Sequence, residues 1–275
     1  MSDFSFEIYD RKNITLDQTK TYARLMCDAF KNDLVDKAFN SVDDSLEDST
    51  MPSIYDYEKL RHKIDVMTFK VENLSRDAHL AFLKEDRNRL CLLKSKGDYL
   101  AAAFFSLPEY AVPETKLSLF EHLKFLWLKI YYTLIKCPEL YPLSPLRNEF
   151  VWARSKTGIS DDPQAIDTLK HSSQEQLDTM GYPATYAYFL KVLAVRSDQH
   201  GKGVGRVFMD LIESHITSIA LPPPDLTPQA KAKIVLQSAP TARGFYKKIG
   251  FTCGGTASHL VNNMMIDHSS FFKDI

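Results

Sequence analysis

A cluster of glycines is the feature of the sequence that most directly indicates chemistry. Residues 200–205 read His-Gly-Lys-Gly-Val-Gly and lie between an apolar run and a segment with helical spacing. This order places unpaired backbone N–H groups and the positive end of a helix dipole at one point. Glycines also let the backbone approach a phosphate closely, and Lys202 and Arg206 could add positive charge at the rim. The sequence therefore predicts an anion site.

Three kinds of nucleotide-type ligand use a turn of this sort. A P-loop requires Lys followed by Ser or Thr after its last glycine, and that pair is absent here. The dinucleotide pattern G-x-G-x-x-G fails because position 206 is Arg. Coenzyme A remains as the ligand class. For the glycine cluster taken alone, a tight turn without any ligand is the alternative.

The residues around the turn resemble motif A of the GNAT acetyltransferases. The triplet Leu193-Ala194-Val195 precedes it by four residues, and His200 to Gly205 follow the pattern Q/R-x-x-G-x-G/A. The sequence departs from the pattern at His200, which stands where the family has Gln or Arg. Later in the chain, Ser238 and then Gly244 to Phe251 resemble motif B, in which F-Y-x-x-x-G-F closes the fold. Two motifs in the family's order favour a ligand site over a bare turn.

This resemblance implies an N-acetyltransferase that moves an acetyl group from acetyl-CoA to a primary amine, by direct attack within a ternary complex. A GNAT-fold protein that binds acyl-CoA without transferring it is the alternative. Pantetheine would pair with the backbone of Leu193 and Val195, and the Leu193 N–H would polarise the thioester carbonyl. The implied acetyl-CoA contacts are Leu193, Ala194, Val195, His200, Gly201, Lys202, Gly203, Val204, Gly205, Arg206, Ser238 and Tyr246.

The reaction needs two proton transfers, because a neutral amine must attack the thioester and a thiolate must leave. By the resemblance, Tyr246 is the acid that protonates the thiolate, so the implied catalytic residues are Tyr246 and Leu193. Tyr246 also lies on the apolar face of its own predicted helix, where a tyrosine can simply be part of the core. Both interpretations follow from the sequence.

No base is evident on the strand before the turn. Some GNAT subfamilies have Glu or His two or four residues before the Leu193 position, where this sequence has Lys191 and Phe189. Deprotonation through water, or through a side chain of an inserted region, is therefore expected. Candidates in that region are Glu149, His122 and His171. His215, on the apolar face of the helix after the turn, is expected to be packed and hydrogen-bonded.

The flanking patterns supply the elements that must position these residues. By period-two alternation or β-rich composition, strands are expected at 4–9, 89–94, 99–107, 185–195, 233–238, 251–256 and 263–267. Helices are expected after a capping box of Thr15 and Gln18, and at 57–69, 119–135, 204–219 and 242–249. The resemblance implies an α/β fold with a mixed, mostly antiparallel, twisted sheet. Helices would flank this sheet, and it would splay between the two strands around motif A.

Some seventy residues separate two neighbouring strands of this scheme, where GNAT proteins commonly have a short turn. We therefore expect a single domain over residues 1–275 with an insertion at about 108–183. Its helix at 119–135 has a wide apolar arc that includes Trp127 and Tyr131. This arc could cover the amine site as a lid or pack against the sheet.

Composition narrows the class of protein. With 44% hydrophobic and 25% charged residues the chain resembles an ordinary globular protein. The formal net charge of -1, without a basic stripe, argues against a nucleic-acid partner and fits a small amine acceptor better than a polycation. The most apolar run, 117–135, is interrupted by Glu121, Lys124 and Lys129, so no membrane span is expected.

The cysteines and the start of the chain indicate the compartment. Cys27, Cys91, Cys137 and Cys253 lie far apart without metal-ligand spacing, so we expect reduced, mostly buried thiols and no metal. The first residues lack a basic segment followed by an apolar stretch, so no signal peptide is expected. A cytoplasmic or nuclear protein is therefore predicted. The co-substrate implied by the GNAT resemblance is acetyl-CoA.

Overall fold

A computed structural model describes residues 4–30, 66–112, 118–136, 187–220, 232–261 and 264–275. The strands are β1 (Phe4–Tyr9), β2 (Asn88–Ser95), β3 (Asp98–Ser106), β4 (Tyr188–Val195), β5 (Lys233–Ser238), β6 (Thr252–Val261) and β7 (Met264–Asp274). The α-helices are α1 (Leu16–Phe30), α4 (Val66–Lys84), α5 (Leu119–Lys136), α8 (Val204–Ile219) and α9 (Arg243–Lys248). Short 3₁₀ turns are η2 (Glu109–Ala111), η5 (Ser197–Gln199) and η6 (Pro240–Ala242).

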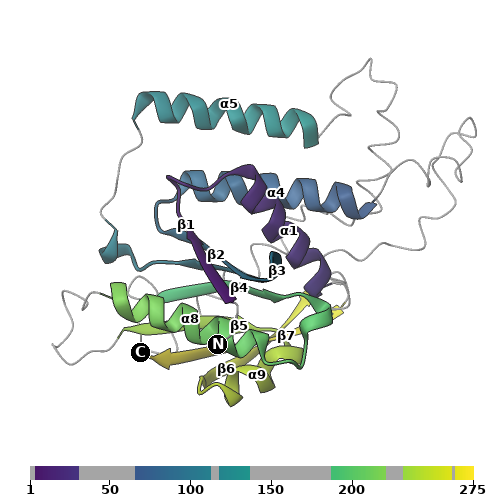
Figure 1. Cartoon of the computed structure of the whole chain (residues 1–275), viewed down its shortest axis with the longest axis vertical. Coiled ribbons are helices and arrows are strands. Elements are labelled where there is room, and N and C mark those ends of the chain that lie inside the picture. Colours follow the sequence, from purple (N-terminus) through teal and green to yellow (C-terminus); the bar gives the residue numbers. More distant parts are fainter. Residues whose placement is uncertain (1–3, 31–65, 113–117, 137–186, 221–231, 262–263) are drawn as a thin grey trace, which may run out of the picture.

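The described strands form one seven-stranded sheet in the order β1-β2-β3-β4-β5-β7-β6 (Figure 1). Neighbouring strands are antiparallel except β4 and β5, which are parallel. The predicted hairpin joins β2 to β3, and its turn residues Lys96 and Gly97 have φ of 49° and 92°. The predicted fold class, a mixed and mostly antiparallel sheet flanked by helices, is confirmed.

Helices cover both faces of this sheet. On one face, Leu90 and Leu92 of β2 belong to a buried cluster with residues of α1 and α4. On the other face, Cys91 and Leu93 belong to a cluster with residues of α8 and α9. Successive side chains of a strand point to opposite faces, so a strand covered on both sides reads as a continuous apolar run. This double cover explains the unbroken apolar composition of β2 and β3.

Helix α1 begins as the capping-box pattern predicts. The Thr15 backbone N–H donates to Gln18 Oε1 at 2.8 Å, and the Thr15 hydroxyl also contacts this oxygen. The Gln18 side chain therefore satisfies an N–H group that precedes the first helical turn. The buried residues Tyr22 and Leu25 then anchor α1 on the sheet, next to α4.

Three expected elements had wrong or too narrow bounds, and one of these is the strand expected at 251–256, which continues in β6 to Val261. The expected helix at 57–69 lies mostly outside the described residues, and α4 continues to Lys84. The buried face of α4 includes Ser75 and Ala78, whose small side chains leave only a faint apolar period. The strand expected at 263–267 continues in β7 to Asp274, because polar Ser269 and Ser270 are buried between β5 and β6.

Helix α5 forms an outer layer on α4 (Figure 1). Tyr132 Oη lies 3.1 Å from His79 Nδ1 of α4, and Glu121 pairs with Arg11 at 2.8 Å. Trp127 and Tyr131 stack with ring centroids 5.2 Å apart and are 61% and 44% exposed. The helix therefore packs on α4 and not on the sheet.

The remaining sequence expectations concern cysteines, metals and membranes. Cys27 and Cys91 are buried free thiols and Cys253 is an exposed one, while Cys137 lies outside the described residues. Within the described ranges, no three His, Cys, Asp or Glu side chains cluster in a way that could hold a metal ion. In the same part of the chain, no helix has the length and apolar content needed to cross a bilayer.

Candidate functional site

The glycine cluster forms the turn that joins β4 to α8. Gly201 and Gly203 have φ of 75° and 82°, in the left-handed region that side chains with a Cβ rarely adopt. Gly203 is the N-cap of α8, and its carbonyl accepts the N–H groups of Arg206 and Val207. The first N–H groups of a helix, here those of Val204 and Gly205, have no acceptor within it, so they point out of the end of α8. The predicted anion site therefore has the unpaired backbone N–H groups that it requires.

The sheet opens beside this turn. Strands β4 and β5 pair only over Tyr188–Leu190 and Ile234–Leu236. Beyond that point β5 continues along β7, whereas β4 continues along β3 as far as Val195. Among the described strands, none pairs with the β5-facing edge of β4 over residues 191–195. The predicted splay between the two strands is thus present, and it exposes backbone groups of β4.

A cavity of about 600 Å³ lies where the opened edge meets the turn. Nine of the twelve predicted contact residues line it: Leu193, Val195, His200, Gly201, Gly203, Val204, Gly205, Arg206 and Tyr246. The charged side chains on its wall, Arg206 and Lys248, are both basic. A cavity with apolar walls, a helix N-terminus and basic side chains suits an apolar chain that ends in phosphate groups.

Three predicted contact residues do not line the cavity. The Ala194 side chain is fully buried, because alternation along β4 turns it away from the face of Leu193 and Val195. Lys202 is exposed and lies outside the cavity wall. The Ser238 side chain is buried and donates to the Ala239 carbonyl at 2.9 Å. Any contact that Ala194 or Ser238 makes with a ligand in the cavity would have to involve the backbone.

Other lining residues were not predicted from the sequence as contacts. The additional ones are Ala29, Phe30, Gln199, Thr241, Ala242, Phe245, Lys248 and Ile249. The sequence indicated the face that carries Phe245 and Ile249, because both follow the apolar period of the last helix. It gave no sign that the C-terminal end of α1, with Phe30, would form a wall. That wall results from the packing of α1 across β3 and β4.

Two side chains fix the turn in place. His200 Nε2 lies 2.8 Å from the Val195 carbonyl oxygen, which can only accept, so Nε2 carries the proton. The Asp28 carboxylate of α1 accepts the Ser197 N–H at 2.6 Å and the Ser197 hydroxyl at 2.9 Å. These bonds hold η5 to the end of β4 and to α1, so the position of the glycines depends on three elements.

Tyr246 is both a core residue and part of the cavity wall. Its side chain is 6% exposed, and its ring packs against Phe245, Phe251 and Phe271 with centroids 5.1 to 5.9 Å apart. Burial raises the pKa of the Tyr246 phenol above its ordinary value of 10.0. The phenol therefore stays protonated at neutral pH and can donate a proton into the cavity. The two interpretations offered by the sequence are compatible.

No predicted candidate for the base, and neither residue at the family's base positions, lines the described cavity. Lys191 is the extra residue where the β3–β4 register shifts, and its Nζ lies 3.2 Å from Asn88 Oδ1. Phe189 packs in a small cluster with Val235. His122 is exposed on α5, and Glu149 and His171 lie outside the described residues. On the wall of the described cavity, His200 is the single imidazole and there is no carboxylate.

His215 is packed as predicted, at the far end of α8. Its ring meets those of Phe6 and Phe105, each with centroids 6.5 Å away. Burial, and then the positive charge of Arg89, lower the pKa of His215 below its ordinary value. Among the described residues no hydrogen bond to its ring is found. The expected hydrogen bond of His215 is therefore absent from the described part of the structure.

Comparison with known proteins finds solved acetyltransferase structures that are similar to this chain at low sequence identity. No family model and no curated protein matches the sequence. A solved GCN5-related N-acetyltransferase from Rhodopseudomonas palustris is similar at 10% identity, with 100% of this chain and 98% of that chain covered and a TM-score of 0.43. The mixed sheet, its opening between β4 and β5 and the glycine turn at that opening are the features that the sequence led us to expect.

Two further solved structures show the same level of similarity. An acyl-CoA N-acyltransferase from Pseudomonas aeruginosa is 11% identical, with 98% of this chain and 99% of that chain covered and a TM-score of 0.40. A polyamine N-acetyltransferase from Drosophila melanogaster is 7% identical, with 98% and 100% covered and a TM-score of 0.44. Similarity of this degree concerns only the arrangement of helices and strands.

Proposed function

We propose that this protein transfers an acetyl group from acetyl-CoA to a primary amine, by direct attack within a ternary complex. One observation carries the proposal: the free edge of β4 and the glycine turn open into the same cavity. The turn offers N–H groups to a pyrophosphate, and the strand edge offers backbone groups to an extended pantetheine chain. The basic side chains Arg206 and Lys248 favour the charge of the nucleotide half.

The residues then take the following roles in the proposed reaction. The Leu193 N–H polarises the thioester carbonyl, so that negative charge can develop on its oxygen as the amine attacks. As the C–S bond breaks, Tyr246 gives its phenolic proton to the leaving sulfur. The proton lost by the amine passes to water, because the described cavity wall carries no carboxylate. A small amine is favoured over a protein as the acceptor.

A second candidate function is binding of acyl-CoA without transfer. The lack of a carboxylate on the described cavity wall favours it, since a transferase benefits from a base near the amine. Tyr246, which lines the same cavity as Leu193, favours transfer, because its phenol could serve as a proton donor there. Both candidates share the donor site and differ only in the release of free thiol.

The donor site is tested by Gly203→Val, with Gly97→Val as a matched control. Both glycines have positive φ, 82° and 92°, and an added Cβ would meet no heavy atom within 4 Å at either position. The two variants therefore carry similar backbone strain, roughly 1–2 kcal/mol or more for a branched residue. Only the side chain at position 203 would occupy space that the proposed pyrophosphate needs.

Titration calorimetry with acetyl-CoA should show about tenfold or greater weakening in Gly203→Val and unchanged affinity in Gly97→Val. Equal affinity in both variants and wild type would refute the donor site. A panel of polyamines, arylalkylamines and a peptide N-terminus, with free thiol as the readout, then separates the two functions. Tight acetyl-CoA binding without thiol release for any amine would favour the binding protein over the transferase.

A further inference from the structure

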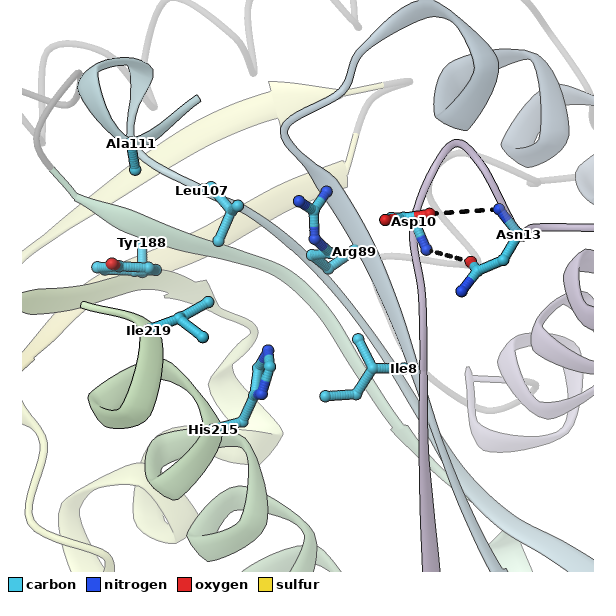
Figure 2. A pocket seen from close by; sticks show the side chains of 9 residues that line it. All are labelled: Ile8, Asp10, Asn13, Arg89, Leu107, Ala111, Tyr188, His215 and Ile219. Atoms are coloured by element: carbon cyan, nitrogen blue, oxygen red, sulfur yellow. Dashed lines mark hydrogen bonds between the residues drawn. The ribbon is translucent and has the colours of Figure 1, made fainter. Parts of the chain in front are cut away.

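A second cavity, of about 350 Å³, lies at the opposite end of α8 (Figure 2). It is bounded by Ile219 in the last turn of α8, whereas Val204 in the first turn bounds the donor cavity. An α-helix rises about 1.5 Å per residue, so these two positions lie about 22 Å apart. The two cavities share no lining residue. The second one is a separate feature of the fold.

A positive charge projects into this second cavity. Arg89 comes from β2, and its Nη1 donates to the carbonyl oxygens of Asp86 and Asn88 at 2.5 and 2.8 Å. Burial lowers the pKa of the Arg89 guanidinium, although it remains a cation at any physiological pH. Within the described ranges no carboxylate lies at ion-pair distance from Arg89. A partly buried cation whose partners among the described residues are carbonyl oxygens is a favourable partner for an anion.

Two carboxylates, Asp10 and Asp86, lie near Arg89 without forming an ion pair with it. Asp86 pairs with Arg11 at 3.2 Å. Asp10 lines the cavity, and one oxygen of its carboxylate, Oδ1, accepts the backbone N–H groups of Lys12 and Asn13 at 2.8 and 3.2 Å, within its own turn. Figure 2 shows the two bonds between Asp10 and Asn13 that hold this turn. The charges of Asp10 and Asp86 therefore act on Arg89 from beyond ion-pair distance, and they raise its pKa against the larger effect of burial.

The rest of the cavity combines a neutral polar group with apolar side chains. His215 of α8 points into it, and burial together with the charge of Arg89 favours its neutral ring. A neutral imidazole can donate one hydrogen bond to an anion without adding a charge. Ile8, Leu107 and Ile219 form apolar walls contributed by β1, the end of β3 and α8. The cavity thus has a polar side with Arg89 and His215, here called the polar pole, and an apolar side with Ile8, Leu107 and Ile219, here called the apolar pole.

We propose that this cavity binds a small organic carboxylate with an aliphatic or aromatic tail. The carboxylate would form a two-pronged contact with the Arg89 guanidinium and accept a hydrogen bond from His215. The tail would lie against Ile8, Leu107 and Ile219. The volume, about 350 Å³, is at the lower end of small-molecule sites and suits a ligand of this size. The proposal does not depend on the acetyl-transfer function.

Hexanoate and benzoate are suitable probes, with hexanamide and benzamide as neutral analogues of the same shape. Binding is measured on the full-length protein by saturation-transfer NMR and by thermal shift at constant ionic strength. The carboxylates should bind and raise the melting temperature, and the amides should not. Equal signals from carboxylate and amide, or no binding by any probe at millimolar concentration, would overturn the proposal. Inorganic phosphate that binds as well as hexanoate would overturn the assignment of the apolar pole.

Arg89→Gln should weaken hexanoate binding roughly ten- to hundredfold, because it removes the charge and one prong of the contact. Arg87→Gln is the matched control, since Arg87 pairs with Glu109 at 3.0 Å and does not line the cavity. If Arg89→Gln fails to fold, Ile219→Glu serves instead, because this residue is 37% exposed and would place a carboxylate at the cavity. Unchanged hexanoate affinity in Arg89→Gln or Ile219→Glu would contradict the proposal, and acetyl-CoA affinity should be the same in all these variants.

Discussion

Tyr246→Phe separates the catalytic role of this tyrosine from its structural role. The ring is buried against Phe245, Phe251 and Phe271, and the Phe variant keeps all of that packing. No described group accepts a hydrogen bond from the Tyr246 hydroxyl, so its removal breaks no bond within the described fold. We therefore expect the free energy of unfolding to change by less than about 1 kcal/mol. A larger loss of activity would then reflect chemistry.

The expected loss in turnover follows from the leaving group. General acid catalysis contributes about 10²–10⁴-fold in rate. A thiolate departs fairly well without help, because a thiol of this kind has a reference pKa of about 8.5. We therefore expect a loss in kcat at the lower end, about a hundredfold, with acetyl-CoA affinity nearly unchanged.

The pH dependence provides a second test. Burial raises the pKa of Tyr246 above 10.0, so the acid form persists throughout the range in which most enzymes are assayed. The ratio of wild-type kcat to the kcat of the Phe variant should consequently be constant from about pH 7 to 9.5. Ionisation of Tyr246 should not lower the wild-type activity within this range. Thiol release, measured under saturating acetyl-CoA, gives both profiles.

Tyr22→Phe is the matched control for this experiment. Tyr22 is also buried, with a pKa raised by burial, but it lies with α1 on the opposite face of the sheet. Its Phe variant should keep wild-type turnover. A well-folded Tyr246→Phe protein with wild-type kcat at every pH would refute the acid role and leave Tyr246 as a core residue only.

Two further predictions concern the support of the site and the stability of the fold. Asp28→Ala should weaken acetyl-CoA binding by calorimetry at least tenfold, because the turn loses two hydrogen bonds to a charged group, each typically contributing about 1.5–3 kcal/mol. Wild-type affinity in this variant would show that other contacts hold the turn. Burial raises the pKa values of Cys91 and Tyr22 in the folded state, so the unfolded chain releases these protons first and stability should fall as the pH rises from about 9. Urea unfolding at pH 8 and 10.5 measures this, and Tyr22→Phe should reduce the slope by up to about 1.4 kcal/mol per pH unit above pH 10.

The sequence alone determined the local units of the donor site. Strand, glycine turn and helix follow one another within thirty-two residues, from Tyr188 to Ile219, so their order is visible in hydrophobic period and glycine positions. The β2–β3 hairpin and the cap of α1 were predicted for the same reason, since each depends on contacts a few residues apart. The resemblance to GNAT motifs A and B implied twelve contact residues, and nine of them line the cavity.

Only the tertiary structure decided what surrounds those units. Ala194 and Ser238 belong to the predicted motifs, yet their side chains are buried away from the cavity because strand alternation and sheet pairing set their direction. Phe30 forms a wall because α1 crosses the sheet beside β4. Phe30 and Leu193 on this wall are more than 160 positions apart in the sequence, and no local period encodes such a contact.

The Arg89 cavity shows the same division most clearly. Ile8, Arg89, Leu107 and His215 come from four segments with ordinary strand or helix patterns, and none belongs to a motif. The antiparallel register of β1 with β2 and the packing of α8 on the sheet bring them together. The sequence determined that each of these residues would lie on a buried or half-buried face. Which of them meet was decided by pairing and packing between distant segments, because register and helix placement depend on the summed burial of the whole core.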